Sequence, residues 1–279
     1  MIPLRIESFD GTVLAFEARP GRGRDALCLV HATGFCKETW QPVIEELDED
    51  GAAPLVLIDQ RAHGDSAVPE PPYDWWDLGR DVIAVLSAVP ERVGAGAGHS
   101  SGATALAMAE LLAPGSFEAL VLIEPIILPP PFRRLEDNRL SAASLRRRRS
   151  FPSAQEALEN FLGKEAFAGW DRRALEAYVQ GGFELADGAW TLKCPPQAEA
   201  EFYRGATAHG AWDRIGEIRC PVVVVAGEQS ESHVLPFVER QVRRFPQAEL
   251  VIVPGATHFV PMEQPAAVAA VIAGAMGWQ

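Results

Sequence analysis

Short apolar segments, separated by helix-like stretches, constrain the fold of this chain more than any other feature. The apolar segments lie at residues 26–30, 55–58, 119–123, 222–225 and 250–253. Strands that are apolar on both faces belong to parallel sheets with helices packed on each side. The helix-like stretches lie at residues 39–47, 77–88, 101–113 and 265–276. This alternation predicts an α/β fold with a mostly parallel, doubly wound sheet and flanking helices.

The alternation begins after two strand-like segments and is interrupted once. Residues 4–8 and 12–18 flank Asp10-Gly11, a dipeptide typical of a β-hairpin turn. From residue 129 to residue 218 there is no comparable apolar segment, and the helix-like stretches there are 133–149, 154–162 and 171–180. The sequence therefore predicts a core of residues 1–128 and 219–279. A mostly helical insertion, residues 129–218, follows the sixth strand of that core.

The charge of the chain limits its partners. With 25 Lys and Arg against 38 Asp and Glu, the formal net charge is −13 at pH 7. An acidic surface repels phosphate backbones and anionic lipids, so we expect neither nucleic acid nor a membrane as partner. The N-terminal residues lack the pattern of a secretory signal, and no apolar run approaches the roughly 20 residues that span a bilayer.

The cysteines and motifs point away from disulfides and cofactors. Cys28, Cys36, Cys194 and Cys220 have no spacing typical of a disulfide framework or a zinc site, which fits a cytoplasmic protein. No metal, dinucleotide or nucleotide motif is present, so we expect no metal and no cofactor. The oligomeric state is not encoded in any motif of the sequence.

The most informative motif is Gly98-His99-Ser100-Ser101-Gly102. It matches the nucleophile elbow, in which a serine occupies a strained turn between a strand and a helix. Residues 92–98 can form that strand and residues 101–113 that helix, so Ser100 would lie at a helix N-terminus, which favours developing negative charge. A capping serine at the end of a glycine-rich strand is the alternative reading of the motif.

A histidine near the C-terminus supplies the matching base. His258 lies on a loop between the apolar segment 250–253 and the helix-like stretch 265–276. From such a loop an imidazole can reach the elbow serine and remove its proton. Alone, the histidine would equally suit a structural role, but the elbow upstream favours catalysis.

With these motifs the chain resembles the cap-bearing serine hydrolases of the α/β-hydrolase fold family. The resemblance also includes residues 29–35 after the third strand and residues 59–66 after the fourth. It implies that residues 129–218 form a lid over the site, and that the N–H groups of Thr33 and Ser101 form an oxyanion hole. Ala32 stands where the family usually has glycine, a departure that leaves the Thr33 N–H usable.

The resemblance also implies a carboxylate that orients His258, and three glutamates compete for this role. The family usually has an aspartate shortly after the strand that includes residues 222–225, and this chain has none there. Glu231 is our preferred candidate. Glu124, directly after the apolar segment 119–123, is the alternative, and Glu228 ranks third.

The remaining predicted site residues concern the substrate. We expect His31, Phe35, Trp170 and Trp212 to line its pocket, although tryptophans also serve as core anchors. Residues 133–134 and 146–149 are arginines. They could form a positively charged rim that steers anionic substrates, but a solvated helix face is the interpretation we favour.

The predicted activity is hydrolysis of a small ester, lactone or thioester through an acyl intermediate on Ser100, with a small molecule as the substrate. The alternatives are cleavage of a carbon–carbon bond in a diketone-like compound, acyl transfer, and a ligand receptor built on the same fold.

Overall fold

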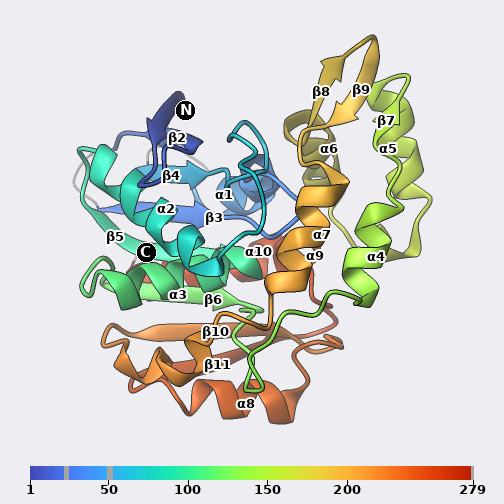
Figure 1. The fold of residues 1–279 in the computed structure, drawn as a ribbon. Helices are drawn as coiled ribbons and strands as arrows, with labels where there is room; N and C mark the ends of the chain where they lie inside the picture. Colours follow the sequence, from blue (N-terminus) through green and yellow to red (C-terminus); the bar gives the residue numbers. More distant parts are fainter. Residues whose placement is uncertain (22–24, 49–52, 278–279) are drawn as a thin grey trace.

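The computed structural model describes residues 1–21, 25–48 and 53–277, and an eight-stranded sheet forms its centre (Figure 1). The strand order is β1-β2-β4-β3-β5-β6-β10-β11. The pairs β1–β2 and β2–β4 are antiparallel, and all other neighbours are parallel. The strands are β1 (Ile2–Glu7), β2 (Val13–Arg19), β3 (Ala26–Val30), β4 (Leu55–Ile58), β5 (Val93–His99), β6 (Ala119–Ile123), β10 (Val222–Gly227) and β11 (Ala248–Val253).

Helices cover both faces of this sheet. On one face α2 (Trp75–Ala88) packs against α3 (Ser101–Leu112), and on the other α1 (Gln41–Leu47) packs against α10 (Pro265–Met276). Successive residues of a strand point to opposite faces, and β3 shows the division. Cys28 belongs to the core cluster of α2 and α3, whereas its neighbour Leu29 belongs to that of α1 and α10. The predicted α/β class with a mostly parallel sheet is confirmed.

Residues 129–218, the proposed cap, contain both helices and a small sheet, and most of these elements stand to one side of the main sheet in Figure 1. The three-stranded sheet has the order β7-β9-β8. The elements are α4 (Arg139–Leu145), β7 (Ser150–Phe151), α5 (Ala154–Leu162), η2 (Glu165–Phe167), α6 (Arg172–Gly181), β8 (Phe183–Ala186), β9 (Ala189–Leu192), α7 (Pro196–Gly205), η3 (Ala211–Asp213) and η4 (Ile215–Glu217).

The small sheet and α7 were not predicted from the sequence, and the helix expected over 133–149 is limited to α4. The hairpin between β8 and β9 turns at Asp187 and Gly188, whose φ angles are 51° and 76°. Asp-Gly at such positions is a strong hairpin signal. This dipeptide could have revealed the two strands.

The topology brings several loops to one edge of the sheet. Parallel strands β3, β5, β6, β10 and β11 all end at the same edge, where ligands of open α/β sheets bind. The loops that follow them include Thr33, Ser100, Glu124, Ser232 and His258. Three further helical segments are η1 (Lys37–Trp40), α8 (Leu235–Val242) and α9 (Val260–Glu263). Within the described ranges, no helix is both long and apolar enough to cross a bilayer.

Candidate active site

Ser100 lies on a sharp turn between β5 and α3. Its backbone angles, φ 55° and ψ −113°, belong to a region that residues with a Cβ rarely adopt. Glycine is required on both sides of it. A Cβ on Gly98 would lie 2.6 Å from the Ala103 nitrogen, and a Cβ on Gly102 would lie 2.2 Å from the Val30 carbonyl oxygen. The turn therefore has the strained strand-to-helix geometry that the motif predicts.

The Ser100 hydroxyl has no hydrogen-bond partner among the described residues. The residue is 8% exposed, and its carbonyl oxygen accepts a hydrogen bond from the Thr104 hydroxyl. The expected hydrogen bond from the hydroxyl to His258 is thus not formed in this structure. Such contacts are often long in substrate-free enzymes and shorten when substrate binds.

His258 lies beside the elbow. The His99 Nε2–H donates to the His258 carbonyl oxygen over 2.8 Å, and the two ring centroids are 5.1 Å apart. Burial, followed by the charge of His258, lowers the pKa of His99 to about 3, so His99 stays neutral near pH 7. His99, the residue before Ser100, therefore holds the backbone of His258, the predicted base for Ser100.

Glu124 is the carboxylate that holds the His258 ring. Its Oε2 lies 2.8 Å from His258 Nδ1, and its side chain is fully buried. The Gly227 N–H donates to Oε1 over 2.9 Å, and the Ser230 hydroxyl donates to Oε2 over 2.7 Å. Burial raises the pKa of Glu124, but hydrogen bonds from His233 and His258 outweigh it and hold this pKa well below its usual range.

The preference for Glu231 as the partner of His258 is therefore wrong. Glu231 is exposed on the loop after β10, and it makes no hydrogen bond or ion pair with His258. Glu228 is also exposed, and its carboxylate accepts from the Gly255 N–H. The alternative residue Glu124 is the one that contacts His258. It follows β6, which lies beside β10, and its φ of 52° turns the chain at the sheet edge.

A second histidine contacts the same carboxylate, and the sequence analysis missed it. His233 Nδ1 lies 2.7 Å from Glu124 Oε2, and its Nε2 lies 3.0 Å from the Pro125 carbonyl oxygen. The ring is buried and lies 6.0 Å from that of His258. The sequence places His233 on the loop after residues 222–225, where a carboxylate was expected, and this position could have indicated a role at the site.

The two predicted oxyanion-hole residues flank the elbow with free donors. The Thr33 N–H makes no hydrogen bond to any residue the structure describes. The Ser101 N–H belongs to the first turn of α3, where N–H groups lack intrahelical partners. Both residues are buried. Both N–H groups therefore remain candidates for the oxyanion hole.

Two of the four predicted pocket residues come together near His258. The ring centroids of Phe35 and Trp170 are 5.2 Å apart, and both rings pack against Phe259, the residue after His258. Tyr178 of α6 packs against Phe35 at 5.2 Å. An aromatic wall formed by the core and the proposed cap therefore lies next to the imidazole.

The other two predicted pocket residues lie elsewhere. His31 is fully buried, donates through Nδ1 to the Ala32 carbonyl oxygen and accepts the Gln60 N–H at Nε2, so it supports the loop instead of facing a pocket. Trp212 stacks on Phe237 at 6.2 Å in the core cluster of α2 and α3. Both expectations are corrected by the geometry, because hydrogen bonding and packing already occupy these side chains.

The arginine-rich segment is only partly a solvated face. Arg148 lies 4.3 Å from the Phe151 ring, and Arg149 is exposed. Arg147 instead points inward, pairs with Glu199 and donates to the Tyr178 hydroxyl over 2.5 Å.

The inward arginine lies against the loop that includes Thr33. A Cβ on Gly34, the next residue, would lie 3.3 Å from Arg147 Nη1 and 2.9 Å from Glu199 Oε1. An ion pair of the proposed cap thus contacts the candidate oxyanion hole.

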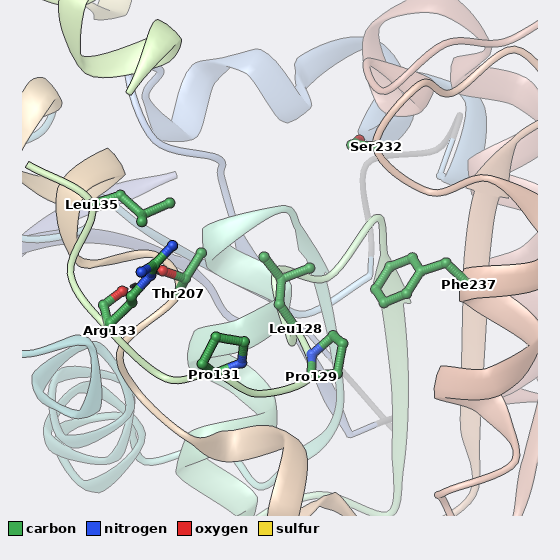
Figure 2. Close-up of a pocket in the computed structure, with 8 residues that line it drawn as sticks. All are labelled: Leu128, Pro129, Pro131, Arg133, Leu135, Thr207, Ser232 and Phe237. Atoms are coloured by element: carbon green, nitrogen blue, oxygen red, sulfur yellow. Dashed lines mark hydrogen bonds between the residues drawn. The ribbon is translucent and has the colours of Figure 1, made fainter. Parts of the chain in front are cut away.

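A cavity of about 360 Å³ is lined by residues from the loop after β6, from the segment that precedes η3 and from the region around α8 (Figure 2). It reaches Ser232, whose Oγ lies 3.2 Å from His258 Nδ1, but Ser100 is not part of its lining. Its walls are formed by Leu128, Pro129, Pro131, Arg133, Leu135, Thr207, Ser232 and Phe237.

A family model and one known protein match most of this chain in sequence, and a second known protein matches about a third of it. A model of the alpha/beta hydrolase family matches residues 29–271. A 2-(acetamidomethylene)succinate hydrolase of Mesorhizobium japonicum is 26% identical over 207 residues, which are 74% of this chain and 72% of that protein. The peroxisomal membrane protein LPX1 of Saccharomyces cerevisiae is 30% identical over 119 residues, 37% of this chain and 31% of that protein.

Solved structures agree in fold. The crystal structure of E-2-(acetamidomethylene)succinate hydrolase covers 99% of both chains with a TM-score of 0.84 and 22% identity. That of Lpx1 from Saccharomyces cerevisiae covers 96% of this chain and 82% of its own, with a TM-score of 0.79 and 22% identity. Together with the match over residues 29–271, these findings show that the chain belongs to the alpha/beta hydrolase family and is an enzyme of the hydrolase type.

Proposed function

We propose that this hydrolase cleaves small esters, lactones or thioesters through an acyl intermediate on Ser100. The observation that supports this best is the buried Glu124 carboxylate on His258 Nδ1, with the His258 backbone bonded to the residue beside Ser100. This arrangement leaves His258 Nε2 free to act on the hydroxyl. A nucleophile, a base and a group that orients the base are the parts that acyl transfer requires.

In the first half of the proposed reaction, His258 Nε2 takes the Ser100 proton while Oγ bonds to the substrate carbonyl carbon. The negative charge that develops on the carbonyl oxygen is stabilised by the N–H groups of Thr33 and Ser101. The bond to the leaving group then breaks, and His258 returns the proton to that group. Glu124 remains ionised throughout and stabilises the imidazolium.

In the second half, water replaces the leaving group. His258 takes a proton from the water as its oxygen bonds to the acyl carbon, and the bond to Ser100 Oγ breaks with return of that proton to the serine. The aromatic wall of Phe35, Trp170 and Phe259 provides an apolar surface for the acyl group near the imidazole.

A substrate with its own carboxylate is a second candidate, favoured by the position of Arg147. Its guanidinium lies beside Gly34, the residue after Thr33 of the candidate oxyanion hole. The relative from Mesorhizobium japonicum is named for a succinate derivative, which is a dicarboxylate. We expect Arg147→Gln to lower kcat/KM for a succinate monoester about 10-fold and to change that of a neutral butyrate ester less than 2-fold.

The alternatives differ in the bond that is cleaved or in the acyl acceptor. Carbon–carbon cleavage of a diketone-like compound and transfer of the acyl group to an alcohol could use the same residues. The receptor alternative is not retained, because the chain is an enzyme of the hydrolase type. A small-molecule substrate and a reducing cytoplasm remain part of the proposal, and the latter fits the four free cysteines.

The test is a panel of p-nitrophenyl esters of graded chain length, with the native chain and with Ser100→Ala. We expect short esters to be hydrolysed, and a fluorophosphonate probe to label one residue per chain, at Ser100. Hydrolysis that persists in Ser100→Ala, or labelling elsewhere, would contradict the acyl-serine mechanism. Hydrolysis of a diketone but of no ester would favour the carbon–carbon alternative.

A further inference from the structure

Four possible metal-binding atoms surround one point on the carboxylate side of His258. They are Glu124 Oε2, His233 Nδ1, His258 Nδ1 and Ser232 Oγ, and they come from the ends of β6, β10 and β11. The Ser232 oxygen lies 3.1 Å from His233 Nδ1, 3.2 Å from His258 Nδ1 and 3.3 Å from Glu124 Oε2. The two ring nitrogens lie 2.7 and 2.8 Å from that carboxylate oxygen.

The hydrogen-bond pattern of His233 suits a metal ligand. His233 Nε2 faces the Pro125 carbonyl oxygen, which only accepts, so Nε2 carries a proton. A neutral His233 would then point the lone pair of Nδ1 at the Glu124 carboxylate. Either a second proton or a metal ion on Nδ1 removes this repulsion. A histidine that donates its other N–H to a backbone carbonyl is the usual arrangement of a metal ligand.

The dimensions suit a tetrahedral transition-metal ion. Zinc bonds to imidazole nitrogen at about 2.0–2.1 Å and to carboxylate oxygen at about 2.0–2.2 Å, which places neighbouring ligand atoms roughly 3.3 Å apart. The three contacts of Ser232 Oγ already have this length. The two shorter contacts to Glu124, 2.7 and 2.8 Å, need to lengthen by about half an ångström to reach this spacing.

We propose that Glu124, His233 and His258, with Ser232 as a weaker fourth ligand, bind one Zn²⁺ ion that reversibly inhibits the enzyme. The cavity in Figure 2 provides the entry path, because Ser232 forms part of its wall and is exposed. A metal on Nδ1 forces the remaining imidazole proton of His258 onto Nε2. The ring then has no lone pair to take the Ser100 proton.

Metal binding does not depend on the proposed function, whereas the inhibition does. The first experiment therefore measures binding alone, by calorimetric titration of the full chain with ZnCl₂ and by the visible absorption of Co²⁺ in a tetrahedral site. We expect one ion per chain. His233→Gln should weaken binding at least about 100-fold, and Ser232→Ala about 10-fold. His209→Gln is the matched control, because His209 is a half-buried histidine outside this cluster whose Nε2 likewise faces a backbone carbonyl.

The second experiment measures hydrolysis of the most active p-nitrophenyl ester at increasing Zn²⁺. Inhibition should follow the binding curve, be reversed by EDTA, and shift to higher Zn²⁺ in Ser232→Ala. Absence of saturable binding, or equal binding by His233→Gln and the native chain, would overturn the metal site. Because Ser232 is exposed, we expect Ser232→Ala to fold, and its weaker zinc binding tests the site even if His233→Gln fails to fold. Zinc binding without ester hydrolysis would instead contradict only the proposed function.

Discussion

The residues on the two sides of the His258 ring differ in how many of their polar atoms form hydrogen bonds. On the carboxylate side, Glu124 receives hydrogen bonds from Gly227 and Ser230 and contacts two histidines. On the nucleophile side, the Ser100 hydroxyl and the Thr33 N–H have no partners in the described parts of the chain. Under the proposed mechanism, folding therefore completes the group that orients His258 in advance, and leaves the reactive atoms to be satisfied by substrate.

The sharpest test of this division is Ser100→Ala. If Ser100 is the nucleophile, its removal should lower kcat for a p-nitrophenyl ester by roughly 10⁵-fold, as expected for loss of a member of an acyl-transfer triad. Because the hydroxyl has no partner, the free energy of unfolding should change by less than about 0.5 kcal/mol. Urea denaturation of the same preparations checks the second value. A large loss of stability would show that the hydroxyl is bonded in solution.

The carboxylate side should respond in both activity and stability. Glu124→Gln should lower kcat about 10⁴-fold, because an amide no longer holds the imidazole in the required tautomer. It should also destabilise the fold by roughly 1–3 kcal/mol, since buried partners lose a charged acceptor. Glu231→Gln, on the exposed loop, is the matched control and should leave kcat within 2-fold. If only Glu231→Gln lost activity, the structural assignment of the carboxylate would be wrong.

The contrast also explains how much could be predicted from the sequence. The parallel strands were recognisable because each is apolar on both faces, and the Gly98–Gly102 motif because backbone contacts forbid any Cβ at its ends. His258 was recognisable from its loop after the last strand. These features depend on local sequence, and the structure contains each of them.

The carboxylate and its surroundings depend on contacts between distant segments. Glu124 and Glu231 both follow a strand that ends at the same edge of the sheet, so the pattern alone does not distinguish them. In the structure Glu124 is buried and contacts His258, whereas Glu231 is exposed. His233 joins Glu124 across 109 positions of the sequence, and no local periodicity encodes such a contact.

A third test concerns the loops that support the nucleophile side. The Nε2 atoms of His31 and His63 accept the N–H groups of Gln60 and Gly34, so protonation would break both bonds. Burial lowers the pKa of His31 to about 4, and burial with the charge of His31 lowers that of His63 to about 3. The unfolded chain takes up these protons below a pKa of about 6.5. Stability should therefore fall as the pH decreases from 6.5 towards 4.

The size of this effect can be isolated with His63→Gln, whose amide oxygen can still accept the Gly34 N–H. Each buried neutral histidine contributes about 1.4 kcal/mol per pH unit over this range. Between pH 7 and pH 5 the free energy of unfolding of the variant should fall by about 2 kcal/mol less than that of the native chain. Urea denaturation at the two pH values measures the difference. An equal fall in both proteins would mean that His63 is not held neutral by burial.

The smallest expected effect tests whether the nucleophile side stores backbone strain. With φ at 55° and ψ at −113°, Ser100 occupies a conformation that a Cβ opposes and glycine adopts freely. Ser100→Gly should therefore be more stable than Ser100→Ala by about 1 kcal/mol. In the last turn of α2 the order should reverse: Ser87 is exposed on a helix, where glycine is less favourable than alanine. If alanine were the more stable residue at both positions, the turn at Ser100 would carry no backbone strain. Packing alone would then hold the Ser100 hydroxyl in place.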